Sequence, residues 1–210
     1  MAQVTLHGFP PSSYTWTARA ICAAKGIDVD FQAIMPPAHK APEHLARHPF
    51  GKVPAFSHGD FTLYETLAIA RYVDEVFDGP ALQPADPKAR ARMEQWISVI
   101  DSYLYNQAVP GYIFAYIFPR TPDGAPDTAR IEKTLPDLRH TLAVLNDALA
   151  DSAWLASDAP TLADYFFAPL LLGVSRFPEG KALLEELPNL GRYAGQIIKN
   201  DAIMSTAPQG

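Results

Sequence analysis

The strand-forming patterns of this chain are confined to its first 77 residues, and this segregation most constrains the fold. The predicted strands lie at residues 4–6, 29–31, 53–56 and 62–64. A helical spacing that ends before Gly26 separates the first two, and a short Gly-containing turn separates the last two. A helix between strands favours parallel pairing and a short hairpin requires antiparallel pairing, so we expect a mixed four-stranded sheet.

Every pattern after the proline-rich stretch 78–87 is helical. We therefore predict a first domain at residues 1–80, a linker at 81–88 and an all-helical domain at 89–210. Residues 93–104 and 135–149 each carry hydrophobic side chains along one helical face. Residues 165–174 are hydrophobic on nearly all faces, as expected of a central buried helix. The first domain has the element order of a thioredoxin-like domain.

The composition excludes several classes of function. The single cysteine, Cys22, excludes an internal disulfide and a CxxC redox or zinc site, and its alanine-rich helical face predicts a core residue. A net charge of −6 with scattered basic residues argues against a nucleic-acid partner. We see no signal peptide and no apolar stretch of about 18 residues. We therefore expect a cytoplasmic chain that does not bind membranes.

Lys52-Val53-Pro54 and Glu65-Thr66 together predict a binding site for a small charged molecule. Pro54 favours a sheet edge, a bulge or a cis turn, so Val53 can present its own N–H and C=O to a ligand. Glu65 stands at the start of a helix, whose free N–H groups attract a carboxylate, while its side chain attracts an ammonium group. This pair of charges suits the zwitterionic end of an amino acid or peptide.

Further motifs complete a known pattern. They are Ser12-Ser13-Tyr14, His39-Lys40, Pro49-Phe50-Gly51-Lys52-Val53-Pro54, Glu65-Thr66 and Thr161-Leu162-Ala163-Asp164. On these motifs the chain resembles the cytosolic glutathione transferases, with the phi class and its bacterial relatives as the nearest match. The N-terminal resemblance runs from about residue 4 to residue 77 and is most specific at residues 38–56. Beyond it, the motif at residues 161–164 and the helical lengths around it also match.

The resemblance implies a thioredoxin-like domain followed by a helical bundle, paired as a homodimer. It implies that the chain transfers glutathione, as co-substrate, onto small, mostly apolar electrophiles, with no bound cofactor and no metal. The implied binding residues are His39, Lys40 and Lys52 at the glycine carboxylate, the Val53 backbone at the cysteinyl unit, and Glu65 and Thr66 at the γ-glutamyl end. Pro54 belongs to the same site in a structural role, since a cis bond there would aim Val53. Thr66 departs from the serine commonest at its place but keeps the hydroxyl. His44 and His48 are expected to be solvated surface groups.

Such an enzyme must lower the pKa of the glutathione thiol from roughly 8.5, and a shift of about two units requires roughly 2.7 kcal/mol. A hydroxyl donating to a thiolate contributes roughly 1.5–3 kcal/mol, and a helix N-terminus adds roughly 0.3–1. Ser12 lies on the loop where both effects meet, and the family's spacing favours it over Ser13, the alternative. Either serine could instead only cap the helix. Tyr14 ranks third, because its place suits packing.

The second half offers an apolar pocket and a folding motif. Six aromatic residues could line the pocket or pack in the core or a dimer: Tyr103, Tyr105, Tyr112, Phe114, Tyr116 and Phe118. Of these, Tyr112 and Tyr116 are the preferred pocket residues. Thr161-x-x-Asp164 predicts a capping box, whose role is in folding.

Two alternative functions stay open at this stage. The same thiolate could reduce organic hydroperoxides, or the fold could serve as a non-catalytic binding or scaffold protein. The intact set of ligand-binding residues argues against the scaffold. Thiol–disulfide exchange is disfavoured, because it normally requires a cysteine where Ser12 stands.

Overall fold

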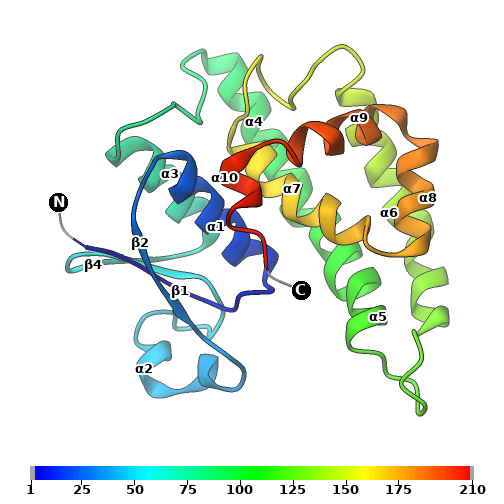
Figure 1. Ribbon diagram of the computed structural model, residues 1–210, viewed down its shortest axis with the longest axis horizontal. Coiled ribbons are helices and arrows are strands. Elements are labelled where there is room, and N and C mark those ends of the chain that lie inside the picture. The colour runs from blue at the N-terminus through cyan, green and yellow to red at the C-terminus, as the bar shows by residue number, and fades with distance from the viewer. Residues whose placement is uncertain (1–2, 209–210) are drawn as a thin grey trace. The chain divides into compact units, whose positions relative to one another are not determined.

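The computed structural model describes residues 3–208 and contains two compact units (Figure 1). The first unit runs to Gln83 and also takes in the chain from Ile198 onward, and the second is Pro84–Ile197. The predicted boundaries assign all residues after 88 to the helical domain, so the structure differs from them in grouping the C-terminal segment with the first unit.

A four-stranded mixed sheet forms the base of the first unit. Its strands are β1 (Val4–Gly8), β2 (Val29–Ala33), β3 (Ala55–His58) and β4 (Phe61–Tyr64), in the spatial order β2-β1-β3-β4. β1 pairs in parallel with β2 and antiparallel with β3, and β3 and β4 form an antiparallel hairpin. The turn places Gly59 at a φ of 58°, which glycine adopts without strain. The predicted mixed sheet is confirmed.

The described part of this unit has four α-helices: α1 (Ser13–Ala24), α2 (Pro42–Leu45), α3 (Thr66–Val76) and α10 (Asp201–Met204). Figure 1 shows α1 and α3 on one face of the sheet and α2 on the other side. Leu6 and Phe56 of the sheet and Ile21 of α1 are fully buried, so this face holds the core. Cys22 is also buried, as predicted. α10 packs against α1, where the Trp16 indole N–H donates to the Ile203 carbonyl at 2.8 Å.

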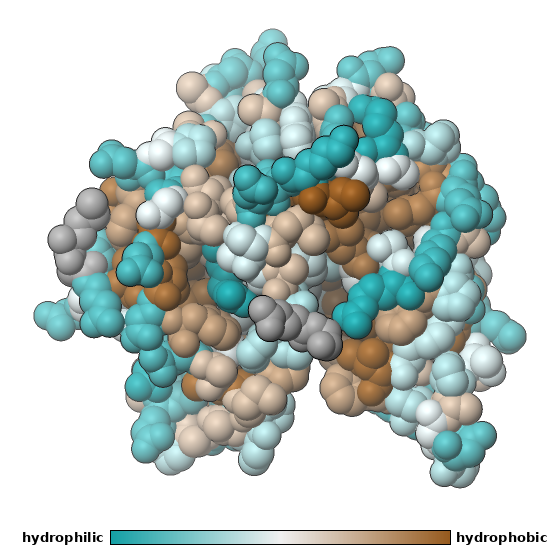
Figure 2. All heavy atoms as spheres, viewed as in Figure 1, coloured by the Kyte–Doolittle hydropathy of each residue, from teal (hydrophilic) through white to brown (hydrophobic). Residues whose placement is uncertain are grey.

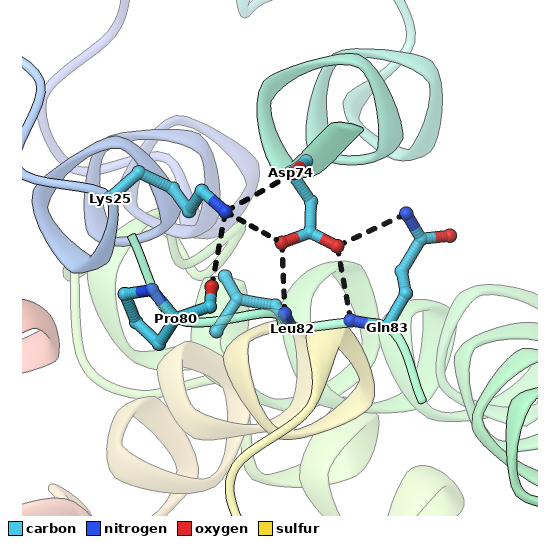
Figure 3. Close-up of polar contacts among 5 residues, drawn as sticks. All are labelled: Lys25, Asp74, Pro80, Leu82 and Gln83. Atoms are coloured by element: carbon cyan, nitrogen blue, oxygen red, sulfur yellow. Dashed lines mark hydrogen bonds and ion pairs between the residues drawn. The ribbon is translucent and has the colours of Figure 1, made fainter. Parts of the chain in front are cut away.

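A buried ion pair fastens the end of the first unit to its core (Figure 3). The Lys25 ammonium, just beyond α1, lies 3.1 Å from a carboxylate oxygen of Asp74 on α3 and also donates to the Pro80 carbonyl. The Asp74 carboxylate accepts the backbone N–H groups of Leu82 and Gln83 at 2.8 and 3.1 Å. The segment 80–83 is therefore held by charge-assisted hydrogen bonds at both of its ends.

The second unit is helical throughout its regular structure. It contains α4 (Pro87–Val99), two π-helical segments (Ile100–Leu104 and Gln107–Ile113), α5 (Phe114–Ile117), α6 (Thr128–Ala148), α7 (Leu162–Val174), α8 (Pro178–Glu186) and α9 (Pro188–Ile197). α7 is the buried central helix that the sequence predicts. The predicted capping box is present at its start, where Asp164 accepts hydrogen bonds from the Thr161 backbone and hydroxyl.

In the part of the chain that the structure describes, no helix is long and apolar enough to cross a membrane. On the face drawn in Figure 2, hydrophilic and hydrophobic residues are interspersed over both units.

Candidate active site

Ser12 is the N-cap of α1. Its backbone is extended, with φ −69° and ψ 128°, and its Oγ accepts a long hydrogen bond of 3.4 Å from the Thr15 N–H. The Ser12 N–H donates to the Phe9 carbonyl at 2.9 Å, which closes the turn between β1 and the helix. In its capping contact the hydroxyl is an acceptor, so its own proton is free to be donated elsewhere. Ser13 is the first residue of the helix proper.

Gly51 brings two of the predicted cationic segments together. It has a φ of 56°, and a Cβ added there would lie 2.8 Å from the His39 carbonyl oxygen and 3.0 Å from the Lys40 ammonium. Only glycine fits this close approach, and it places the short turn Ala38–Lys40 directly against the residue before Lys52. The Lys40 ammonium lies 3.4 Å from the Phe50 carbonyl. Three cationic or potentially cationic side chains therefore come from two adjoining segments.

The Val53–Pro54 peptide bond is cis, one of the conformations that the proline makes accessible. β3 begins at Ala55, so Val53 precedes the hydrogen-bonded ladder. Within residues 3–208, neither the N–H nor the C=O of Val53 is bonded to another backbone group. Val53 therefore has a backbone donor and acceptor available at the end of a strand.

Glu65 joins β4 to α3 in a backbone conformation that few residues with a side chain adopt. Its φ is 72° and its ψ is 117°, and its side chain makes no capping hydrogen bond to the helix. The carboxylate is exposed, whereas Thr66, the first residue of α3, is buried. Conformations of this kind cost about 1–3 kcal/mol and are concentrated at functional sites. An anionic side chain thus stands beside the free N–H groups of a helix start.

His44 and His48 contradict the expectation that they are surface groups. Both side chains are about 2% exposed, because α2 and the turn after it fold them under the Lys52 loop. The His44 Nε2 lies 2.7 Å from the Lys52 carbonyl, and the His48 ring lies 5.0 Å from the Tyr64 ring. A histidine's burial is not visible in its sequence neighbours. The sequence offers one indication: His44 and His48 lie four residues apart, a spacing that places them on one helical face, within the stretch richest in motifs.

The charges around His48 show which groups the loop brings together. Burial lowers the pKa of His48 below its usual value, the charge of Glu65 raises it, and His44 and Lys52 lower it further. The influence of Glu65 and Lys52 on one imidazole links the two predicted binding segments electrostatically. Glu65 and Lys52, one from each predicted binding segment, therefore both lie near the buried His48 ring.

The aromatic residues of the second unit divide by environment. Tyr112 is wholly buried, and its hydroxyl donates to Glu179 at 2.9 Å and accepts from the Gly180 N–H at 2.9 Å, so it is a core residue and not a pocket wall. Tyr116 is partly exposed, donates to the same carboxylate at 2.5 Å and stacks on Phe177 with centroids 4.1 Å apart. Burial raises the pKa of Tyr116 to about 12. Tyr103 and Phe118 are exposed.

Comparison with known proteins gives one consistent result. The family description "Glutathione S-transferase, N-terminal domain" matches residues 2–75, and "Glutathione S-transferase, C-terminal domain" matches residues 106–201. The chain is 32% identical to Glutathione S-transferase 3 of Zea mays over 210 residues, which cover 98% of this chain and 94% of the relative.

Solved structures agree with this. An apo structure of glutathione S-transferase III has a TM-score of 0.86 and 32% identity, covering 98% of this chain and 95% of the other. A structure of glutathione S-transferase-I bound with the ligand lactoylglutathione has a TM-score of 0.87 and 25% identity, covering 98% and 99%.

Proposed function

This chain belongs to the glutathione S-transferase family, and we propose on that premise that it joins the thiol of glutathione to electrophilic, mostly apolar small molecules. The protein's task in this reaction is to bind glutathione, lower the pKa of its thiol and hold the thiolate near the electrophile. The new carbon–sulfur bond forms as the thiolate attacks, and the leaving group departs with the electron pair of its own bond. Glutathione is a co-substrate, and no covalent enzyme intermediate is needed.

The observation that carries the proposal is the strained backbone of Glu65. No capping hydrogen bond of its side chain accounts for a φ of 72°, so the site maintains this conformation for another reason. In the proposed complex the Glu65 carboxylate binds the α-ammonium group of the γ-glutamyl residue, and the N-terminus of α3 with the Thr66 hydroxyl binds its carboxylate.

The remaining groups bind the other two residues of the tripeptide. We assign the unpaired backbone N–H and C=O of Val53, next to Pro54, to the cysteinyl unit, as in a strand added to a sheet edge. Lys40, Lys52 and His39, which Gly51 brings close together, bind the glycine carboxylate. The cysteinyl sulfur then reaches the start of α1.

Ser12 is the group that we assign to the thiol. Its hydroxyl proton is free of the capping contact, and donating it to the sulfur favours the thiolate by roughly 1.5–3 kcal/mol. The N-terminus of α1 adds roughly 0.3–1 kcal/mol. Together these give roughly 1.8–4 kcal/mol, a range that includes the roughly 2.7 kcal/mol required by a pKa shift of about two units.

The test is the rate of glutathione conjugation to chlorodinitrobenzene for the native chain, Ser12→Ala and Ser13→Ala. We expect Ser12→Ala to lose about tenfold to a hundredfold in rate near neutral pH and to recover part of it as the pH rises. Loss confined to Ser13→Ala would move the assignment by one residue. A native chain that binds glutathione and reduces cumene hydroperoxide but leaves chlorodinitrobenzene unchanged would instead favour the peroxidase alternative.

Two finer statements belong to the same proposal. We propose a homodimer, supported by Phe50, which is 65% exposed and meets the exposed Tyr64 edge-on at 6.2 Å. Phe50→Ser is expected to lower the sedimentation-derived mass toward that of one chain, and an unchanged mass would count against this surface.

We also propose a cytoplasmic location, with which the free, buried Cys22 is consistent.

A further inference from the structure

His44 makes one polar contact that stands out in the glutathione-binding unit. The residues around it on α2, Glu43 and Leu45, are exposed, whereas the His44 side chain points inward and is buried. Its Nε2 lies 2.7 Å from the Lys52 carbonyl oxygen. A carbonyl only accepts, so Nε2 is the donor in this contact, and Nδ1 is the other ring nitrogen. In the described part of the chain, that buried Nδ1 has no hydrogen-bond partner.

The Lys52 carbonyl belongs to the same planar peptide group as the Val53 N–H. The cis peptide bonds in residues 3–208 are Pro36-Pro37 and Val53-Pro54, so the Lys52–Val53 peptide is trans. In a trans peptide the C=O and the N–H lie in one plane and point in opposite directions. A donor that fixes the Lys52 carbonyl from the α2 side therefore aims the Val53 N–H away from α2, to the side where a ligand can accept it.

The neighbouring contacts leave this peptide little freedom to rotate. Gly51 lies against the backbone of His39, and its own N–H donates to the His48 carbonyl at 2.8 Å. The His48 ring stacks on the His44 ring, with centroids 6.3 Å apart and planes inclined by 21°. The hydrogen bond between His44 and Lys52 is thus enclosed by the same loop that carries the binding residues.

We propose that His44 is a positioning residue for glutathione, which acts by holding the Lys52–Val53 peptide so that the Val53 N–H faces the cysteinyl unit. This inference rests on the proposed function. It gives a role to a buried histidine that does not itself touch the ligand. A purely structural histidine would stabilise α2 without affecting the affinity for glutathione, and the two roles are separable by experiment.

The experiment compares His44→Phe, His44→Gln and His58→Phe with the native chain. Phenylalanine fills the ring's volume but cannot donate, and glutamine places an N–H near the position of Nε2. His58 is the matched control: it lies on β3 of the same unit, and its Nδ1 lies 3.0 Å from the Tyr72 hydroxyl. Each variant is assayed for KM toward glutathione, for kcat at saturating glutathione and for melting temperature. Glutathione affinity is also measured directly by calorimetry below the lowest melting temperature.

We expect His44→Phe to raise KM and Kd for glutathione about tenfold while kcat changes by less than about twofold, because the thiol-activating group is untouched. His44→Gln should recover most of the affinity. His58→Phe should leave KM near the native value even if its melting temperature falls.

Several outcomes would overturn the inference. A native-like Kd in His44→Phe would do so, as would an equal loss in His58→Phe, which would mark the effect as general destabilisation. Should His44→Phe not fold, His44→Gln carries the test, because glutamine keeps a donor. A Kd for glutathione about tenfold above native in His44→Gln would then show that a donor at this position does not restore the affinity, and would overturn the inference. A native chain that does not bind glutathione at all would overturn the proposed function itself, whereas an active native chain with an unaffected His44→Phe would overturn the positioning role alone.

Discussion

Glu65 has, at the scale of one residue, a backbone conformation that opposes stability and a proposed role in binding. Among residues 3–208 it is the one residue other than glycine with a positive φ. Glycine adopts this backbone without a steric penalty, while any residue with a Cβ is strained there. A glycine at this position would therefore be better for folding, and the proposed bond from the Glu65 carboxylate to glutathione would explain why a glutamate stands there.

Replacing Glu65 with glycine, alanine and glutamine separates these two effects. We expect Glu65→Gly to be more stable than Glu65→Ala by about 1 kcal/mol in urea unfolding, because only glycine relieves the strain. All three should bind glutathione about tenfold or more weakly than the native chain, because the charge-assisted bond to the ammonium group is lost. Glutamine is the control that keeps the size and the strain. Native-like affinity in Glu65→Gln would contradict the assignment.

The histidines near the loop predict a stability that falls in acid. Burial lowers the pKa of His48, and burial also lowers the pKa of His7, where Arg47 and His44 add to the lowering and Asp30 opposes it. An imidazole with a lowered folded-state pKa is more easily protonated when unfolded. Its contribution to stability is therefore complete above about pH 6.5 and is lost as the pH falls through the lower, folded-state pKa.

The measurement is the free energy of unfolding at pH 7.5 and pH 5 for the native chain and His48→Asn. We expect the native chain to lose stability between these values, and His48→Asn to lose less, even if it is less stable at pH 7.5. His140→Asn is the control, because it changes an exposed histidine of the second unit. Equal pH slopes in the native chain and His48→Asn would refute this role of His48.

At this scale the sequence predicts the proposed binding residues more readily than the residues that support them. Lys40, Lys52 and Glu65 stand in a linear motif that can be read directly. The burial of His44 depends on how α2 folds under the loop, which no local pattern encodes. Gly51 is part of the sequence motif. The need for glycine there comes from its close approach to His39, which is twelve residues away in the chain and cannot be predicted from a local pattern.

The ion pair between α1 and α3 allows a test at the scale of elements. Removing Asp74 leaves the buried Lys25 ammonium uncompensated and also leaves the Leu82 and Gln83 N–H groups without their acceptor. We expect Asp74→Ala to cost about 3–5 kcal/mol in urea unfolding. Lys25→Met should cost less, about 1–3 kcal/mol, because the Asp74 carboxylate keeps its backbone donors. Equal costs for the two variants would show that the backbone donors contribute nothing.

The elements themselves were predictable where a single period dominates. The alternation at Val4 and Leu6 and the helical spacing of α3 correspond to observed elements. The two π-helical segments in the second unit were not predicted, because a wider turn keeps the same hydrophobic residues buried and leaves no distinct pattern. Pro110 lies inside one of these segments, whereas from the sequence alone a proline predicts the end of a helix.

On the scale of the whole molecule, the chain enters the second unit after Gln83 and returns to the first at Ile198. The sequence places the linker near its first crossing, because proline and turn residues cluster there. The sequence has no comparable cluster of turn residues where the chain rejoins the first unit at Ile198. α10 is a four-residue helix with one fully buried hydrophobic side chain, Ile203, too short for a periodicity to emerge.

This return predicts that the C-terminal segment supports glutathione binding. Ile203 is 0% exposed, and its carbonyl accepts the Trp16 indole N–H on α1, the helix that Ser12 caps. Ile203→Ala should therefore destabilise the first unit by about 2–5 kcal/mol through the cavity that it leaves. Met204→Ala, one residue further along the same helix and 38% exposed, should change stability by less than about 0.5 kcal/mol.

Trp16 is the natural reporter of this effect. In a background where Trp96 and Trp154 of the second unit are phenylalanine, its fluorescence follows the first unit alone. We expect Ile203→Ala to lower the urea midpoint of that signal and to weaken glutathione binding at urea concentrations where the native unit is still folded. If the segment from Ile198 onward were only an appendage, Ile203→Ala and Met204→Ala would give the same midpoint. A difference between them would mean that the folding of the site at one end of the chain depends on residues at the other.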